Sequence, residues 1–292
     1  MRWLRIAPVF VLLVAGCTGG PRDVDPGPGL AAQRRTAGDV LARWDRAATG
    51  GEMVVVGGLG GLRQVGDWET SVGDNNKAAL QAGLFEAAGG LPAAPDRAVI
   101  RPVQGPERPV RTLSAAAALD RAKRAATRAA PAACGTCEPL RVTGADPTET
   151  DLLTVGGPVT APAWEFRLEG TEVRLVASAV ADGEATELAA FGRPADQPAA
   201  NWVESARPLE GPALDVSFSA APGGADEPCG ADYTGAAVES TRAVVVLVGM
   251  TRTHEAGVCP TIAAVRRITV PLREPLGDRV VLQLYTGLPI QG

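Results

Sequence analysis

PAWEFRLEGTEVRLVASAV, residues 162–180, decides the fold class of this chain. It contains two strand-like runs joined by EGTEV (169–173), where the glycine permits the backbone to reverse within a few residues. Antiparallel strands can be joined by so short a connection, whereas parallel strands need a long crossover. The stretch therefore predicts an antiparallel β-hairpin.

Further strand-like runs flank this hairpin at short spacing, with glycine-containing turns between them. PLRVTGA (139–145) and DLLTVGG (151–157) precede it, and the runs that follow are ALDVSFSA (213–220), YTGAAVES (233–240), AVVVLVGM (243–250), AAVRRITVPL (263–272) and RVVLQLYT (279–286). AVVVLVGM is apolar throughout, which is typical of a strand buried on both faces. Residues 183–212 contain four prolines and predict an irregular linker or long loop.

Helices are expected in the N-terminal half. Apolar residues lie at helical spacing in AGDVLARWDRAA (37–48). The clearest helical pattern begins after Ser114, a residue type that caps helix N-termini, and stops before Pro131. KAALQAGLFEAA (77–88) suits either a helix or a strand, because helix-forming residues surround Gly83.

Short strands are also expected in this half. MVVVGGL (53–59) and LRQVGDW (62–68) predict two strands around a glycine turn, and RAVIRPV (97–103) with RPVRTL (108–113) predicts a hairpin whose prolines favour a sheet edge. The whole pattern predicts an α+β fold that is strand-rich, with mostly antiparallel sheets and one or two helices in the N-terminal half.

The N-terminus has the features of an export signal. Two arginines in MRWLR precede an apolar run from Ile6 to Ala15, which is too short to span a bilayer as a helix. Val14, Ala15, Gly16 and Cys17 resemble the lipobox of bacterial lipoprotein precursors, in which the cysteine thiol receives a diacylglyceryl group and the preceding peptide bond is cut. Fatty acyl chains such as palmitate would then hold Cys17 on the membrane. The alternative is an ordinary signal peptide with an incidental cysteine.

The expected location is therefore the extracytoplasmic face of the cell membrane, with the membrane as a partner through the N-terminal lipid. After Cys17 the chain is rich in glycine and proline and shows no periodicity, which is typical of a tether. The expected organisation is a lipoprotein signal peptide (1–16), a lipidated cysteine and tether (17–36), an N-terminal α+β region (37–133), a β-rich region (134–182), an irregular linker or loop (183–212) and a C-terminal β region (213–292).

Four further cysteines in an exported chain predict two disulfide bonds. Of the three pairings, sequence proximity favours Cys134–Cys137 and Cys229–Cys259. A reactive thiol pair or a zinc site is the alternative for CGTC (134–137). However, no helical pattern follows it to lower a thiol pKa, and the other two cysteines do not repeat its spacing.

GDWETSVGDNNKAAL (66–80) is the strongest candidate for a ligand site. It gathers acids, amides and a lysine around a tryptophan, a combination that can bind a sugar, a cation or a peptide. The residues are Asp67, Trp68, Glu69, Asp74, Asn75, Asn76 and Lys77. The alternative is structural, because Asp and Asn side chains also stabilise turns through hydrogen bonds to the backbone.

The sequence assigns no catalytic residue. Its only histidine, His254, lies in the loop between Cys229 and Cys259 and is expected to be an exposed loop residue. No G-x-S-x-G or G-x-G-x-x-G pattern occurs, and neither a cofactor nor a metal is expected. The net charge of −5 argues against a nucleic-acid partner. A basic stripe on the long helix is expected to be solvated, and the alternative is a face that leans toward anionic lipid headgroups; it consists of Arg121, Lys123, Arg124 and Arg128.

Several motifs together resemble a group of exported actinobacterial lipoproteins of unassigned function. They are the lipobox, GDWE with GDNNKAAL, the run CxxCxPLxVTGA leading into PAWEFRLEGTEV, and CGADYTGAAVES with PLGDRVVL near the C-terminus. The resemblance implies export and the cysteine pattern, and it carries no reaction.

The sequence therefore predicts a lipid-anchored envelope protein whose non-enzymatic ectodomain binds a wall component, a small molecule or a partner protein. The alternative is a histidine-independent hydrolase of cell-wall material that uses paired carboxylates, with Asp67 and Glu69 as the first candidates.

Overall fold

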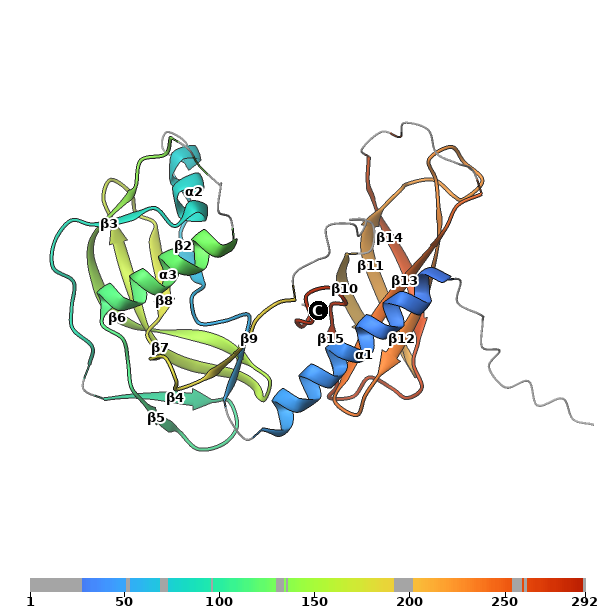
Figure 1. Ribbon diagram of the computed structural model, residues 1–292, viewed down its shortest axis with the longest axis horizontal. Helices are drawn as coiled ribbons and strands as arrows, with labels where there is room; N and C mark the ends of the chain where they lie inside the picture. Colours follow the sequence, from blue (N-terminus) through green and yellow to red (C-terminus); the bar gives the residue numbers. More distant parts are fainter. Residues whose placement is uncertain are drawn as a thin grey trace, which may run out of the picture.

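The computed structural model describes residues 28–50, 53–68, 73–95, 97–129, 134, 136–191, 202–253, 259 and 262–290. These residues form two lobes (Figure 1), a first lobe from residues between 53 and 189, and a second lobe from the helix at 28–49 together with residues 203–290. The α+β, strand-rich and mostly antiparallel fold class is confirmed. The predicted signal peptide, Cys17, Glu69 and His254 lie outside the described residues.

A long hairpin of β6 (Leu140–Thr154) and β7 (Gly157–Leu168) is the spine of the first lobe. The reversal between them uses Gly157, whose φ of 111° is rarely adopted by other residues. β8 (Arg174–Ser178) pairs antiparallel with β7 after a turn at Gly170. The hairpin predicted over residues 162–180 is thus confirmed, and the two runs predicted before it form one continuous strand, β6.

Shorter strands extend this sheet. Among the described residues it has nine strands, in the order β2-β8-β7-β6-β1-β9, with β3 paired to β6, β4 to β7 and β5 to β4. The added strands are β1 (Val54–Val56), β2 (Leu62–Val65), β3 (Phe85–Ala87), β4 (Ala98–Pro102), β5 (Arg108–Val110) and β9 (Thr186–Leu188). β4 and β5 form the predicted edge hairpin.

Two expectations for this lobe need correction. β1 and β2 are strands, but the prediction that they pair around a turn is wrong, because β8, β7 and β6 separate them in the sheet. The boundary expected at residue 134 also divides a single sheet, since β1 and β3 both pair with β6. Pairing between distant segments overrides the local turn signal of the glycines.

Helix α3 (Ala115–Ala129) covers the sheet with an alanine-rich face. Ser114 caps it as predicted, because its Oγ accepts a hydrogen bond from the N–H of Ala117 at 3.3 Å. Ala118 and Leu119 are buried against Trp164 and Phe166 of β7, in the main core of the lobe.

Helix α2 (Gly73–Ala82) and β3 resolve the ambiguity of residues 77–88, which contain part of each. The break falls at Gly83, whose φ is 68°. A Cβ at this position would lie 2.8 Å from the carbonyl oxygen of Lys123 on α3, so only glycine allows α2 to end this close to its neighbour.

The second lobe packs two small sheets face to face. One contains β10 (Val203–Pro208), β11 (Ala213–Ala220) and β14 (Ala264–Pro271), and the other contains β12 (Asp232–Glu239), β13 (Ala243–Thr251) and β15 (Val280–Leu282). Val244, Val246 and Val248 of β13 lie in the core between the sheets with Phe218 of β11. β9 and β10 also show that residues 183–212 are only partly irregular.

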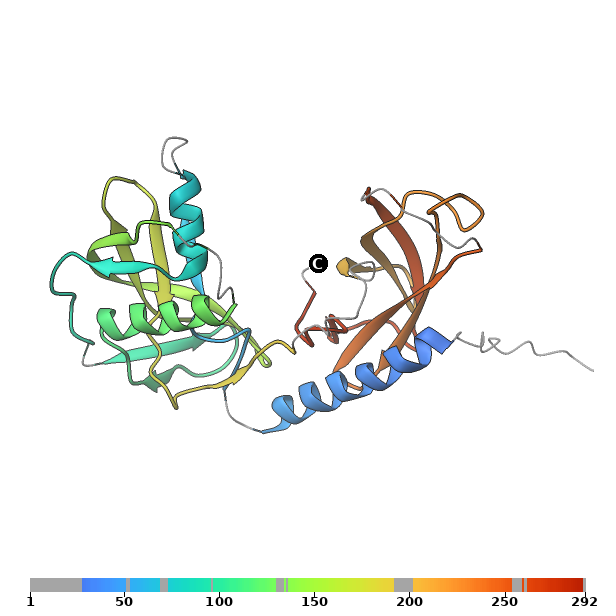
Figure 2. The same ribbon diagram turned by 45° about the horizontal axis from the view of Figure 1, so that its top comes forward.

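Helix α1 (Pro28–Thr49) covers the other face of β13 (Figures 1 and 2). Val40, Leu41 and Trp44 are buried in one cluster with Val245 and Leu247, so β13 is buried on both faces as predicted. The helix predicted at 37–48 is therefore present, but it belongs to the second lobe rather than to the N-terminal α+β region.

The start of α1 corrects the predicted tether of residues 17–36. The helix begins at Pro28, and Leu30 packs against the α1–β13 core. Proline is favoured in the first turn of a helix, where its missing N–H would have no partner, so Pro28 is compatible with a helix start.

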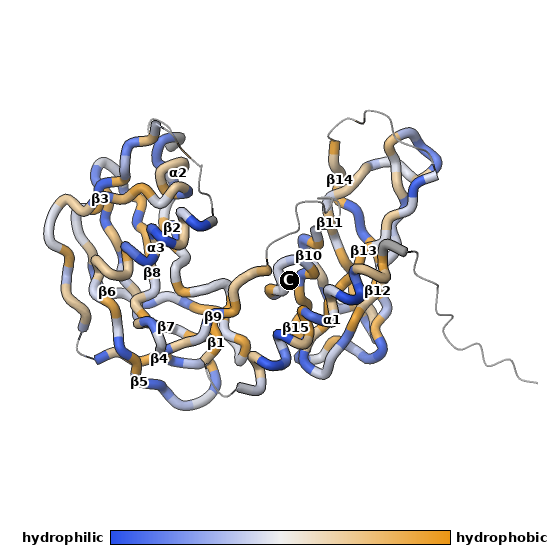
Figure 3. The backbone as a smooth tube through the Cα atoms, in the orientation of Figure 1, coloured by the Kyte–Doolittle hydropathy of each residue, from blue (hydrophilic) through white to orange (hydrophobic). Residues whose placement is uncertain are grey.

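The two lobes meet at a shared apolar cluster. Val54 of β1 and Leu188 of β9 lie in the same core as Val40 of α1, and the tube is coloured hydrophobic along β1 (Figure 3). Arg43 lies over the ring of Phe191 at 4.4 Å and donates to the carbonyl oxygen of Ala189 at 2.7 Å. Helix α1 therefore contacts both segments of chain that connect the lobes, one at β1 and the other at β9 and Phe191.

Both expected cysteine pairs lie at disulfide distance. The Cα–Cα separations are 5.7 Å for Cys134–Cys137 and 5.6 Å for Cys229–Cys259. The second pair joins the segment before β12 to the segment before β14, and it closes the longer loop.

Replacing Trp44 with alanine is expected to lower the free energy of unfolding by about 3–5 kcal/mol, because a large side chain that is 3% exposed leaves a cavity between α1 and β13. Urea unfolding followed by circular dichroism measures this loss. Arg46→Ala, at an exposed position on the same helix, is the control and should change stability by less than about 0.5 kcal/mol. Equal effects of the two variants would contradict the packing role of α1.

Replacing Cys229 and Cys259 together with serine is expected to lower the free energy of unfolding by roughly 3.5 kcal/mol, from the loop-closure entropy restored to the unfolded chain. The Cys134/Cys137 double serine variant should lose about half as much, because its loop is short. Denaturation without reductant provides the comparison, and a larger loss for the short loop would contradict this ranking.

Candidate functional site

The described residues of the ligand site predicted at residues 66–80 have different surroundings in the structure. Asp67 and Lys77 are exposed, whereas Trp68 is half-buried and packs against the core of the first lobe. Asp74 lies in α2, and neither its side chain nor Glu69 is among the described parts of the chain. None of the described residues of this set lines any of the three hollows of the first lobe described below.

Asn75 has a clear structural role. Its side-chain amide donates to the carbonyl oxygen of Glu138 at 3.3 Å and accepts from the Glu138 N–H at 3.0 Å. It also donates to Asn76 Oδ1 at 3.4 Å. The two bonds between Asn75 and Glu138 connect α2 to the segment directly after Cys137. They support the structural alternative for the Asp/Asn cluster.

Trp164 of β7 is sealed inside the first lobe. It is 2% exposed, and its Nε1 donates to the carbonyl oxygen of Leu113 at 2.9 Å. An indole with its only donor already bonded is a core residue, so Trp164 is not accessible to a ligand.

A groove of about 710 Å³ lies elsewhere on the first lobe, between the glycine loop (residues 57–61), α2, α3 and residues 189–190. Its walls are mainly small or apolar and include Leu62, Leu80, Ala122, Ala125 and Ala189. Its polar side chains are Gln81, Arg128 and Glu187. Concave, mainly apolar sites with a few polar groups are typical of small-molecule binding.

The glycine loop forms one wall, and three of its positions require glycine. Gly57 and Gly58 have φ values of 84° and 101°, and a Cβ at Gly60 would lie 2.6 Å from the Cβ of Ala125 on α3. The loop therefore lies directly on the helix and exposes its backbone to the groove. Four glycines in five residues after a buried strand was the available signal, but the sequence interpretation treated them as a turn.

Glu187 fixes this loop from the other side. Its Oε1 accepts a hydrogen bond from the N–H of Leu59 at 2.9 Å, and its Oε2 would lie 3.2 Å from a Cβ at Gly58. Because Glu187 belongs to the edge strand β9, one exposed carboxylate stands at the rim of an otherwise apolar groove.

Arg121 is buried beneath the glycine loop, which corrects the expectation of a solvated basic stripe at this one residue, whereas Arg124 and Arg128 are exposed as expected. It is 7% exposed, and its guanidinium donates to the carbonyl oxygens of Val180, at 2.6 Å, and Ser178. Burial lowers the pKa of Arg121, and the carboxylates of Asp182 and Glu187 oppose that shift. Arg121 thus joins α3 to the end of β8.

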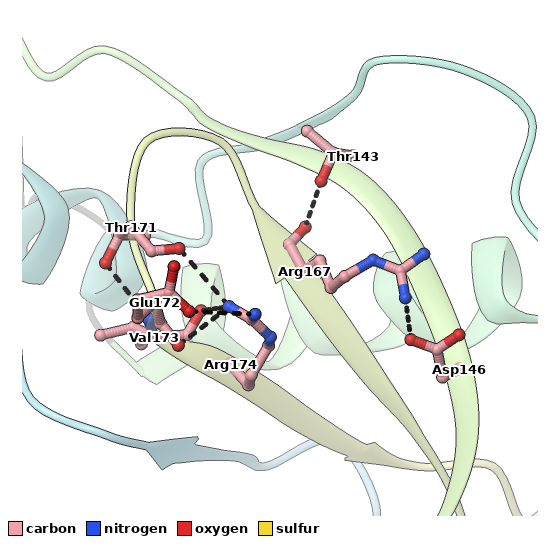
Figure 4. Close-up of polar contacts among 7 residues, drawn as sticks. All are labelled: Thr143, Asp146, Arg167, Thr171, Glu172, Val173 and Arg174. Atoms are coloured by element: carbon pink, nitrogen blue, oxygen red, sulfur yellow. Dashed lines mark hydrogen bonds and ion pairs between the residues drawn. The ribbon is translucent and has the colours of Figure 1, made fainter.

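A second hollow of about 400 Å³ lies beside the turn between β7 and β8. Figure 4 shows the polar contacts among residues around this turn. Arg167 and Arg174 are cross-strand neighbours there. Arg167 pairs with Asp146, and Arg174 donates to the Glu172 carbonyl oxygen at 2.8 Å and lies 3.5 Å from the Glu172 carboxylate. Since both guanidinium groups have partners within the fold, this hollow is the weaker candidate.

A third hollow, of about 220 Å³, also borders the glycine loop and includes Asp151. Each of the three hollows is lined by a single described carboxylate, namely Glu172, Glu187 or Asp151. In the described part of the chain, no three His, Cys, Asp or Glu residues are grouped as metal ligands.

Comparison of the chain with protein-family models, with curated proteins and with solved structures finds no match. Within the described residues, every helix is too short or too polar to cross a bilayer.

The structural role of Asn75 is open to a direct test. Asn75→Ala is expected to lower the free energy of unfolding by about 1 kcal/mol, because two hydrogen bonds to Glu138 are lost at a solvated site. Lys77→Ala, at an exposed position of the same helix, should stay within about 0.5 kcal/mol of the native protein in the same urea titration. If the Asn75→Ala variant is as stable as the native protein, the structural role is contradicted and Asn75 is again a candidate for ligand binding.

Proposed function

We propose that this protein is a lipid-anchored component of the cell envelope whose first lobe binds a small molecule with an apolar body. The binding site is the groove between the glycine loop and helices α2 and α3. The observation that carries this proposal is the groove itself, a site of about 710 Å³ with small apolar walls and a single carboxylate at its rim.

The lining supports a ligand that is mainly apolar. Alanine and glycine residues leave a broad floor, and the hydrogen-bonding side chains are Gln81, Arg128 and Glu187. Glu187 is positioned by its bond to Leu59, so it can accept a hydrogen bond from a ligand without first losing rotamer freedom.

The anchoring is supported by the N-terminal sequence. The basic start, the short apolar run and the tetrapeptide ending in Cys17 fit a lipoprotein precursor, and the resemblance to exported actinobacterial lipoproteins adds to this. Two cysteine pairs at disulfide distance are compatible with an oxidising extracytoplasmic compartment. No observation on the described residues favours the hydrolase alternative, so the proposal is limited to binding.

Filling the groove should abolish binding of an uncharged apolar dye. In the full-length protein, Gly61→Trp adds an indole at a position that lines the groove and where a Cβ meets no atom within 4 Å. N-phenylnaphthylamine fluorescence should then show about tenfold weaker binding, equivalent to about 1.4 kcal/mol.

The matched control is Gly89→Trp, because Gly89 is equally open, lies in the same lobe and does not line the groove. It should bind the dye as the native protein does. Dye binding that Gly61→Trp leaves unchanged would refute the groove as the site, whatever the outcome for the lipid anchor.

A further inference from the structure

One end of the second lobe collects the segments nearest to the predicted lipid. The side chain of Gln33 in α1 donates to the carbonyl oxygen of Val248 at 3.2 Å, so α1 begins beside the end of β13. Ala220 pairs with Ala264, and the N–H of Ala221 donates to the Tyr233 hydroxyl at 3.2 Å, which places the end of β11 and the starts of β12 and β14 together.

We call this the anchor-side end. It consists of the start of α1 and the described parts of residues 220–232 and 250–266. Figure 1 shows the start of α1 at the side of the second lobe, beside β12 and β13.

Large apolar side chains are exposed at this end. Ile262 is 63% exposed, Val265 is 64% exposed and Met250 is 38% exposed, although all three belong to a lobe with a well-packed core. Single exposed apolar residues are common and need no explanation. Three exposed apolar residues at the end nearest to a lipid-bearing cysteine, however, require an explanation.

The chain between that cysteine and the fold is short. Ten residues separate Cys17 from Pro28, and even when fully extended they span no more than about 40 Å. A lipid on Cys17 therefore keeps the anchor-side end close to the bilayer. This step rests on the lipid anchoring proposed above.

The charges at this end are mixed. The described charged residues are Arg34, Arg35, Arg252 and Arg266 together with Asp226, Glu227 and Asp232. Moreover, Arg266 donates to the carbonyl oxygen of Pro222 at 2.6 Å and lies 5.4 Å from the ring centroid of Tyr233. A contact made here depends on apolar side chains rather than on attraction to anionic headgroups.

We propose that the anchor-side end rests on the phospholipid bilayer and that Ile262, Val265 and Met250 enter its interfacial region. The surface is a second membrane contact beside the lipid on Cys17. Helix α1, whose 22 residues span about 33 Å, then leads from the bilayer to the first lobe and holds the ligand groove away from the membrane.

The test uses the full-length acylated protein in phosphatidylcholine vesicles. Val265→Cys carries a nitrobenzoxadiazole label, and Val103→Cys is the matched control, because Val103 is 75% exposed on the turn between β4 and β5 of the first lobe. Mass spectrometry of each variant checks that Cys229 and Cys259 remain paired.

The label at residue 265 should be quenched by nitroxide lipids and should be about threefold less accessible to aqueous iodide than the label at residue 103. This difference should persist in high salt and without anionic lipid. Equal iodide accessibility at the two sites, or a contact that requires anionic lipid, overturns the proposal while leaving the anchoring intact. A native protein without acyl groups on Cys17 overturns the anchoring and this proposal together, and it leaves the groove untouched.

Discussion

The burial of β13 on both faces is the constraint on which the rest of the structure depends. One face of this apolar strand is covered by the sheet of β10, β11 and β14, and the other by α1. Because α1 precedes the first lobe in the chain and β13 follows it, the second lobe is complete only when both ends of the described chain come together. The first lobe is therefore an insertion between α1 and β10, and α1 ties its two connections to the second lobe through Val54, Leu188 and Phe191.

The groove of the first lobe results from close approach between a loop and a helix. Gly60 allows the glycine loop to touch Ala125, while Arg121 passes beneath the loop and bonds to the end of β8. A buried guanidinium costs free energy unless its donors find acceptors. The carbonyl oxygens of Val180 and Ser178 accept from the two terminal nitrogens of Arg121, whereas its buried Nε has no hydrogen-bond partner among the described residues. The same contacts that stabilise α3 on the sheet therefore also keep the glycine loop in place, so that Glu187 stands at the rim of a preformed site.

Location and binding are connected through α1 in our proposal. A lipid on Cys17 would lie near one end of this helix, and the ligand groove belongs to the lobe that follows its other end. Such an arrangement suits a protein that presents a site to the space outside the membrane, rather than one that takes its ligand from within the bilayer.

The sequence by itself determined the elements that depend on neighbouring residues: the helix capped by Ser114, the hairpins at residues 97–113 and 162–180, the fully apolar strand β13 and the proximity-based cysteine pairs. Spacing and turn chemistry act over a few residues and can be read along the chain. Only the tertiary structure decided that α1 covers β13, that β1 and β2 lie far apart in one sheet, that Arg121 is buried and that the glycine loop, rather than Asp67 to Lys77, borders a groove. Each of these depends on contacts between segments many residues apart, where the burial of apolar surface outweighs the local preference of either segment.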